Sequence, residues 1–176
     1  MYYIVMELVE GTDLRRYLRS RGILNVGRAV IIAHDVALGL GAVHRRGLVY
    51  TGVCSQHVLI DRDGSIKLTA FSTLSPPLYY APEQAKGEMV TPATDVYALG
   101  NVMYEMLTGR TLFDGDTPVA VAMQHTQDLP IPPSQYNPNI PPPLEEIILR
   151  CLEKVPEKRY RDGSTLARAL ESLGEA

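Results

Sequence analysis

The spacing of hydrophobic positions changes along the chain, and each spacing predicts a kind of element. The β-branched and aromatic run over residues 2–9 predicts a strand, ended by a turn at Glu10 and Gly11. Two apolar runs, 58–60 and 66–68, enclose a turn-rich stretch and predict a β-hairpin. The predicted β-structure is therefore small.

Helical spacing dominates the rest of the first half. Thr12 is expected to cap a short helix that runs to about Ser20. Asn25 is expected to cap a longer one, with one apolar face, that ends at Gly47. Each predicted helix thus begins at a residue whose side-chain oxygen can accept a backbone N–H.

The second half predicts a buried central helix and three others. Thr91, followed by a proline, is a strong signal for the start of a helix, and Gly109 is a plausible end of it. The apolar residues between them cover most of the helix circumference. Further helices are expected from Thr117 to about residue 125, over residues 144–152, and after a cap at Ser164. Seven prolines between positions 130 and 143 predict an irregular connection. We expect one mainly α domain over residues 1–176.

Composition removes several classes of function. The chain has 45% hydrophobic and 21% charged residues and a net charge of -3, so nothing indicates a basic nucleic-acid surface. No apolar run is expected to form a membrane span, because none reaches ~18 residues, and the start lacks the features of a signal peptide. Two distant cysteines, Cys54 and Cys151, favour a reducing compartment. We expect a cytoplasmic protein without nucleic-acid or membrane partners.

Several motifs stand in an order that resembles protein kinases. Ala81, Pro82 and Glu83 match the family's Ala-Pro-Glu, residues 95–100 read Asp-Val-Tyr-Ala-Leu-Gly, and residues 156–160 match its late Pro-x-x-Arg segment. The stretch 132–152 resembles bacterial Ser/Thr kinases in particular. The resemblance covers nearly the whole chain and implies a kinase-like C-terminal lobe, helical with a small β-hairpin.

The resemblance also implies contacts and omissions. Glu83 should pair with Arg159, and Asp95 should accept hydrogen bonds from the loop at residues 50–52. Since no residue precedes Met1, the N-terminal lobe, with its glycine-rich loop and ATP-binding lysine, is expected to be absent from this chain.

The catalytic positions that the resemblance assigns hold other residues. Tyr50, Thr51 and Gly52 stand where active relatives have His-Arg-Asp, so the base position is a glycine. Cys54 replaces the catalytic-loop lysine, and His57 replaces the metal-binding asparagine.

The metal-binding motif departs from the family in the same way. Ala70, Phe71 and Ser72 stand where the family has Asp-Phe-Gly, so the carboxylate for magnesium is missing. Only residues 73–80 separate them from Ala81, fewer than in active relatives. Loss of a general base alone costs roughly 10²–10⁴-fold. We therefore predict a pseudokinase that is not an enzyme and binds no cofactor.

A replacement metal site is a weaker alternative. Cys54 and His57 have a C-x-x-H spacing, and His44 lies on the preceding helix. Two ligands do not define a zinc site, and drift of an unused pocket is simpler. His34 and His125 are interpreted as packing or surface residues.

The predicted function is a protein interaction or regulatory module. In kinases the other lobe covers a face that here consists of Tyr2, Tyr3, Ile4, Val5, Met6, Leu59 and Phe71. We expect a homodimer or a protein partner on it. Two alternatives remain: one half of a kinase that transfers phosphate when an N-terminal lobe completes it, and a truncated remnant without function.

Overall fold

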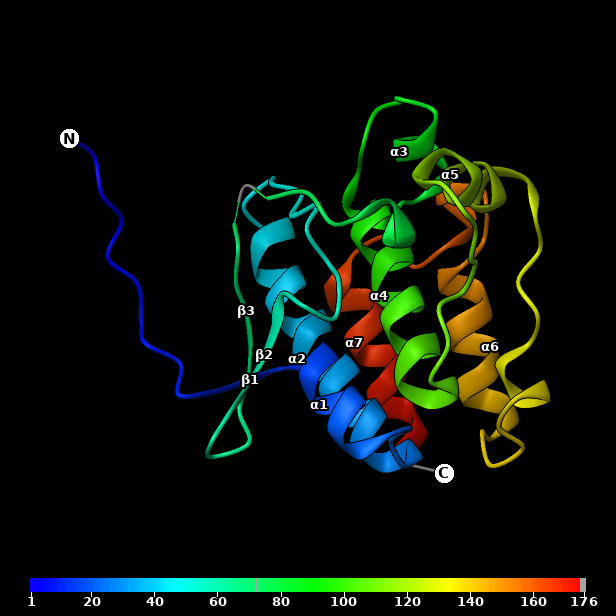
Figure 1. Cartoon of the computed structure of the whole chain (residues 1–176), viewed down its shortest axis with the longest axis horizontal. Helices are drawn as coiled ribbons and strands as arrows, with labels where there is room; N and C mark the ends of the chain where they lie inside the picture. Colours follow the sequence, from blue (N-terminus) through cyan, green and yellow to red (C-terminus); the bar gives the residue numbers. More distant parts are fainter. Residues whose placement is uncertain (72, 175–176) are drawn as a thin grey trace.

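The computed structural model describes residues 1–71 and 73–174. A helical body carries a small sheet on one side (Figure 1). The helices are α1 (Leu14–Arg21), α2 (Val26–His44), α3 (Pro82–Ala85), α4 (Pro92–Thr108), α5 (Pro118–Gln127), α6 (Pro142–Cys151) and α7 (Gly163–Glu171). Short 3-10 turns lie at Pro77–Tyr79 (η1), Pro133–Gln135 (η2), Pro156–Lys158 (η3) and Ser172–Gly174 (η4). The mainly α fold is as predicted.

The sheet has three antiparallel strands in the order β1-β2-β3. They are β1 (Gly11–Asp13), β2 (Val58–Asp61) and β3 (Ile66–Leu68). Thr12 pairs with Ile60, which in turn pairs with Ile66. The predicted hairpin is confirmed, and the sheet places the loops before β2 and after β3 next to each other.

The predicted strand at residues 2–9 is wrong. Residues 1–10, which we call the N-terminal arm, have no regular structure and extend away from the body (Figure 1). The ladder begins at Gly11, where we had expected a turn, because a strand needs a neighbour and β2 is paired only with β1 and β3. The arm is attached through Glu10, whose carboxylate pairs with Arg62 at 3.1 Å, and Glu7, which pairs with Lys67.

The caps of the first two helices were predicted with one error. Asp13, not Thr12, caps α1, since its carboxylate accepts the Arg16 N–H at 2.9 Å. Asn25 caps α2 as predicted and accepts the Arg28 N–H at 2.8 Å. Asp and Thr are both good caps, so sequence alone did not separate two adjacent candidates.

The central helix α4 is buried on nearly all sides, as its pattern predicted. It starts after Thr91 and ends at Gly109, whose left-handed φ of 68° a side chain would strain. A Cβ on Gly100 would lie 2.8 Å from the Cβ of Cys151, so a glycine permits the close approach of α6. Helices α2 and α7 pack together on another side of α4.

The remaining helices lie close to their predicted bounds. Thr117 caps α5 and accepts the Ala120 N–H at 3.1 Å. Asp162, not Ser164, caps α7 and accepts the Thr165 N–H at 2.8 Å. The short α3 was not predicted, because four residues are too few to show a helical period.

Helix α2 also corrects an expectation about membranes. It has 19 residues, and an 18-residue window within it has a mean hydropathy of 1.6. By length and composition this helix could cross a membrane, contrary to the expectation from sequence. Seven of its residues are nevertheless buried in the body, where α2 contacts α4 and α7. A core helix has the same composition as a span.

Candidate functional site

Asp95, near the start of α4, organises the loop that follows α2. One carboxylate oxygen accepts the N–H of Tyr50 at 2.8 Å, and the other accepts the N–H of Thr51 at 2.7 Å. Asp95 is 1% exposed, so these charge-assisted bonds are screened little by solvent. The contact that the resemblance implied between Asp95 and this loop is confirmed.

His44 is a third partner of Asp95, which sequence reasoning missed. Its Nε2 lies 2.8 Å from Asp95, while its Nδ1 accepts the Gly163 N–H at 3.0 Å. Because Nδ1 accepts, Nε2 carries the proton that is donated to the carboxylate. His44 therefore joins α2, α4 and α7 beneath the loop. Residues 44 and 95 are too far apart in sequence to reveal this.

Glu83 and Arg159 form the predicted ion pair. Two guanidinium nitrogens of Arg159 lie 2.7 and 2.9 Å from the Glu83 carboxylate oxygens, and the Thr94 hydroxyl donates to the same carboxylate at 2.8 Å. Burial opposes the charge on Glu83, but Arg159 holds the pKa of that carboxyl below its usual value. The pair fixes α3 against the segment before α7.

The backbone of two loops adopts a strained conformation. Thr51, in the loop before β2, and Ala70, after β3, both have a φ of 59°. A β-branched residue rarely adopts this left-handed geometry, and such strain persists only where surrounding contacts impose it. At Thr51 the hydrogen bond to Asp95 does so.

The position of the expected base is closed by the chain itself. A Cβ on Gly52 would lie 2.5 Å from the carbonyl oxygen of Thr73, and the Ser75 N–H donates to the Thr51 carbonyl at 3.2 Å. The short segment 73–80 therefore lies directly on the loop at residues 50–52. Any larger side chain at position 52 would displace backbone.

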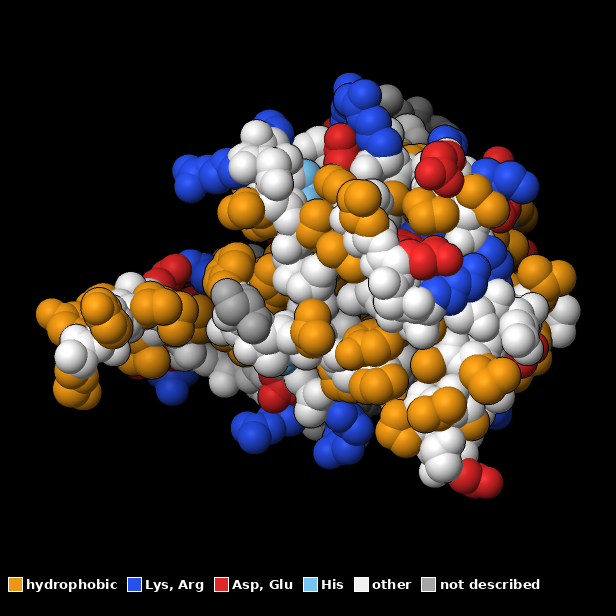
Figure 2. Space-filling view, turned by 90° about the horizontal axis from the view of Figure 1, so that it is seen from above, with side chains coloured by type: hydrophobic (Ala, Val, Ile, Leu, Met, Phe, Trp, Pro, Cys, Tyr) orange, Lys and Arg blue, Asp and Glu red, His pale blue; other side chains and the backbone are white. Residues whose placement is uncertain are grey.

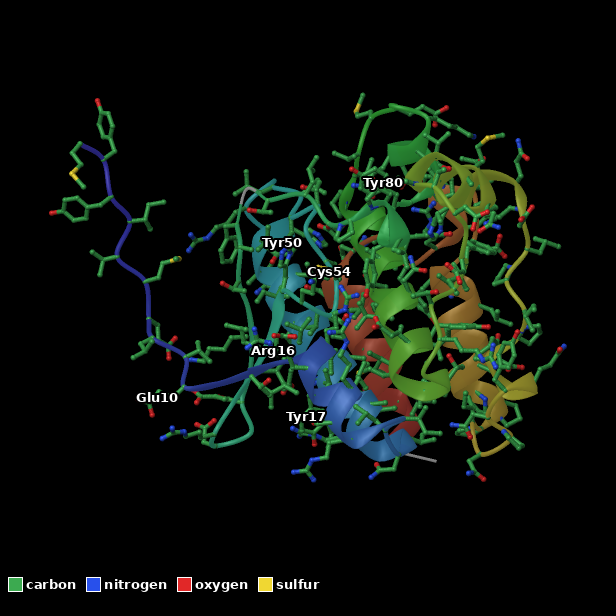
Figure 3. The ribbon with its side chains drawn as sticks, viewed as in Figure 1. Glu10, Arg16, Tyr17, Tyr50, Cys54 and Tyr80 are labelled. Atoms are coloured by element: carbon green, nitrogen blue, oxygen red, sulfur yellow. The ribbon has the colours of Figure 1, made fainter. Side chains whose placement is uncertain are left out.

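Cys54 and His57 contact other groups of the fold. Cys54 is fully buried, and burial raises the pKa of its thiol. The Nδ1 of His57 lies 2.6 Å from the Gly52 carbonyl, and His44 is engaged by Asp95. In the described ranges 1–71 and 73–174, no three His, Cys, Asp or Glu side chains gather to hold a metal ion. Figure 3 shows Tyr50 and Cys54 between the hairpin and α4.

A partly buried cluster beneath the loop before β2 was also missed. The Tyr79 hydroxyl donates to Glu105 at 2.7 Å, and Ser55 lies within hydrogen-bond distance of both, at 2.9 and 3.2 Å. Burial raises the pKa of Glu105. The signal in the sequence was the one carboxylate in the apolar second half of α4.

The other two histidines lie as interpreted. His34 contacts Glu171 at the surface, at 2.9 Å. His125 is fully buried on α5, where its ring lies 2.8 Å from the Tyr97 hydroxyl and 2.9 Å from the Leu78 carbonyl. Burial lowers the pKa of His125 to about 4.

The residues predicted to form an apolar face are mostly exposed. Tyr2, Tyr3, Ile4, Val5 and Met6 are 69–105% exposed, and Figure 2 shows hydrophobic side chains along the projecting arm. Phe71 is 58% exposed and packs edge-on against Tyr50, at 5.4 Å between ring centroids. Leu59 is half-buried. We call these seven residues, Tyr2–Met6, Leu59 and Phe71, the apolar face.

A cavity of about 330 Å³ lies beside this face. It is lined by Met6 and Val9 of the arm, Leu59 and Leu68 of the hairpin, and Phe71. Ser72, the last residue matched to the metal-binding motif, lies outside the described residues.

Comparison with known proteins agrees with this arrangement of loops and helices. The model of the protein kinase domain matches residues 1–170, so the chain belongs to the protein kinase family. The kinase domain of Mycobacterium tuberculosis PknI has the same fold, with a TM-score of 0.81 and 27% identity over 95% of this chain and 64% of that one.

The relatives are bacterial serine/threonine kinases. A probable serine/threonine-protein kinase of Clostridium perfringens is 37% identical over 97% of this chain and 27% of its own length. PrkC of Bacillus subtilis is 34% identical over 100% of this chain and 30% of its own length. PknB of Mycolicibacterium smegmatis is 34% identical over 93% of this chain and 29% of its own length. The chain thus spans less than a third of these relatives, and the part it matches is a kinase C-terminal lobe.

Proposed function

We propose that this chain is a protein-interaction module built on the kinase fold and that it does not transfer phosphate. The observation that carries the proposal is at the base position, where Gly52 has no acidic side chain and the Thr73 carbonyl occupies the space for one. An acceptor hydroxyl has neither a base nor room to approach there.

The other chemical positions support the same proposal. Phosphoryl transfer depends on metal ions held against the phosphates and on an oriented nucleophile. Ala70 and His57 stand where the family has the metal-binding Asp and Asn. Groups that act as a unit lose most of their effect when one is removed, so loss of three leaves little chemistry.

The apolar face supplies the interaction. Monomers rarely expose contiguous apolar patches beyond a few hundred Å², and an extended arm with five exposed apolar residues, Tyr2–Met6, is a surface that association would bury. Within the described part of the chain, residues 1–9 make no backbone hydrogen bond. Their N–H and C=O groups are free to pair with another strand.

We propose a second copy of the chain as the occupant. Two arms can pair antiparallel about a twofold axis, because the run Tyr2–Met6 has high β-propensity and carries no charge. A different protein that adds a strand to the arm is the other outcome. We place the module in the cytoplasm, where the buried thiols of Cys54 and Cys151 stay reduced.

Light scattering after size exclusion tests the interaction. The chain is expected to elute as a dimer at micromolar concentration, and the double variant Ile4→Lys, Val5→Lys as a monomer, because charges on both sides of the arm oppose burial. Leu129→Lys is the matched control, since Leu129 is 82% exposed but distant from the arm in sequence, and it should remain dimeric. A monomeric parent chain that captures no strand-adding partner through the arm would refute the proposal.

A second candidate function is supported by the coverage of the relatives. The chain matches 64% of a kinase domain, so another polypeptide or further sequence could complete an ATP site. The two candidate functions predict different results in two assays. A shift of the thermal midpoint with Mg-ATP, and labelled phosphate on an acceptor protein, would favour the second. No shift and no label are expected from the first.

A further inference from the structure

A second site lies between α1 and the C-terminal end of α4 (Figure 1). It is a cavity of about 380 Å³ whose walls include Arg15, Leu18 and Arg19 of α1, Ile23 after it, and Glu105 of α4. This volume is near the lower end of ligand sites and suits one or two side chains of a bound peptide.

Two arginines on one wall of the cavity have no ion-pair partner in the described part of the chain. Arg15 and Arg19 are four residues apart on α1 and so share a face of the helix. Among the described residues, neither has an acidic group within 4.0 Å. The other arginines of α1 differ: Arg16 pairs with Asp13 at 3.3 Å, and Arg21 stacks on a tyrosine ring.

The carboxylate in the cavity does not satisfy the arginines. Glu105 already accepts hydrogen bonds from Tyr79 and Ser55, at 2.7 and 3.2 Å. Burial raises the pKa of Glu105, and the charge of Arg15 only partly opposes this. Arginine stays protonated in proteins. The cavity therefore carries excess positive charge in a chain whose net charge is -3.

We propose that this cavity binds an acidic segment of a partner protein, with one carboxylate bridging Arg15 and Arg19. Guanidinium groups bind carboxylates through two parallel, charge-assisted hydrogen bonds, which gives both strength and orientation. Leu18 and Ile23 line the same cavity and offer contact to an apolar neighbour of the acidic residue. Charge complementarity between an acidic segment and this wall sets the choice of partner.

The site is separate from the apolar face and does not depend on the proposed dimer. Its residues come from α1, α4 and the positions just after these helices, whereas the apolar face comes from the arm, β2 and the loop after β3. It also contacts the catalytic-loop region, because the Arg15 N–H donates to the Ser55 carbonyl at 3.1 Å.

Fluorescence anisotropy with the full chain tests the site. The probe is a fluorescein-labelled peptide in which glutamates alternate with leucine and glycine, and its partner probe has every glutamate replaced by glutamine. The acidic peptide is expected to bind saturably and to weaken about tenfold between ~0.05 M and ~0.5 M salt, because salt screens exposed charges. The glutamine peptide is expected to bind at least about tenfold more weakly.

Variants of α1 supply the controls. Arg15→Gln with Arg19→Gln should weaken the acidic peptide by about tenfold or more, and Arg19→Gln alone by roughly threefold to tenfold. Arg16→Gln with Arg21→Gln removes the same charge from the same helix and should change the affinity by less than about twofold. Circular dichroism verifies that each variant is folded. If the double variant does not fold, Arg19→Gln alone still tests the site, because Arg19 is exposed.

Three results would overturn the proposal. They are the absence of saturable binding by the parent chain, equal binding of the glutamine peptide, and equal weakening by the control pair. The last would show a general charge effect of the arginine-rich helix.

Discussion

The buried framework under the catalytic loop and the positions that would perform chemistry on it differ in what they retain. In the framework, Glu83 is held by Arg159 in a two-point ion pair, and Asp95 accepts three hydrogen bonds. At the chemical positions, Gly52 and Ala70 carry no polar side chain. The loops are held in kinase-like geometry, while these two positions carry only a hydrogen atom and a methyl group.

Folding and chemistry constrain different residues. A buried charge is costly when its partner is lost, so the framework residues stay together as long as the domain must fold. No such penalty protects a base or a metal ligand, because an exposed carboxylate adds little to stability. Fold and framework can therefore persist when the residues at the chemical positions change.

The framework is broken most severely at Arg159. Arg159→Ala leaves the Glu83 carboxylate buried without its countercharge, so we expect the free energy of unfolding to fall by about 3–5 kcal/mol. Urea denaturation followed by circular dichroism measures the change. Arg62→Ala removes an exposed pair with Glu10 and is the control, with an expected loss under about 1 kcal/mol. Equal losses in the two variants would show that burial of the pair has no special effect.

Buried His125 makes the stability of the fold sensitive to acid. Its pKa is about 4 in the folded chain and near 6.5 when unfolded, so between these values the unfolded chain binds the extra proton. Stability should therefore fall as pH drops from about 6.5 to about 4, by on the order of 3 kcal/mol in total. Denaturation curves at about pH 7, 6 and 5 measure how steeply the free energy of unfolding changes with pH.

A matched variant isolates the histidine. His125→Gln should unfold more easily at neutral pH but lose most of the slope in that window. His34→Gln is the control and should keep it, because His34 contacts Glu171 at the surface and the pKa of His34 is raised, which contributes the opposite slope. A slope unchanged in His125→Gln would assign the acid sensitivity to other groups.

At the chemical positions, restoring a carboxylate should lower stability and give no phosphotransfer activity. Gly52→Asp places a Cβ 2.5 Å from the Thr73 carbonyl, and displacing that backbone should cost roughly 1–3 kcal/mol. Thermal unfolding measures the loss, and a phosphotransfer assay should still give no product. Gly27→Ala is the control, since its Cβ meets only a side-chain atom at 3.6 Å, and it should be neutral or slightly stabilising. A Gly52→Asp variant as stable as the parent would mean that segment 73–80 does not close the position.

Local signals in the sequence were enough for most of the fold. Asn25 starts a helix through its side-chain cap, and Gly109 ends one through its left-handed backbone conformation. Both signals are local, so both helix ends were predicted correctly. The strand over residues 2–9 was predicted from β-propensity and was wrong, because a strand depends on a neighbour that propensity does not contain. Caps at Asp13 and Asp162 were displaced by one or two residues from the predictions.

The candidate site was predictable only where family motifs named its residues. The pair of Glu83 with Arg159 and the contacts of Asp95 followed from those motifs. The hydrogen bond between His44 and Asp95 could not be predicted, since the two residues are 51 positions apart in the sequence. The closure of Gly52 by Thr73 was also beyond sequence reasoning, because the path of segment 73–80 depends on tertiary packing.

The most direct test of the account is a phosphotransfer assay with the chain joined to the upper lobe of an active bacterial relative. The fusion removes the absence of an ATP-binding lobe as an explanation, so only residues such as Gly52 and Ala70 remain to limit the chemistry. With Mg²⁺ and γ-labelled ATP, we expect no label on the fusion or on an acceptor protein beyond that of a fusion denatured before the assay. Stoichiometric labelling that follows the purified fusion through chromatography would contradict the account.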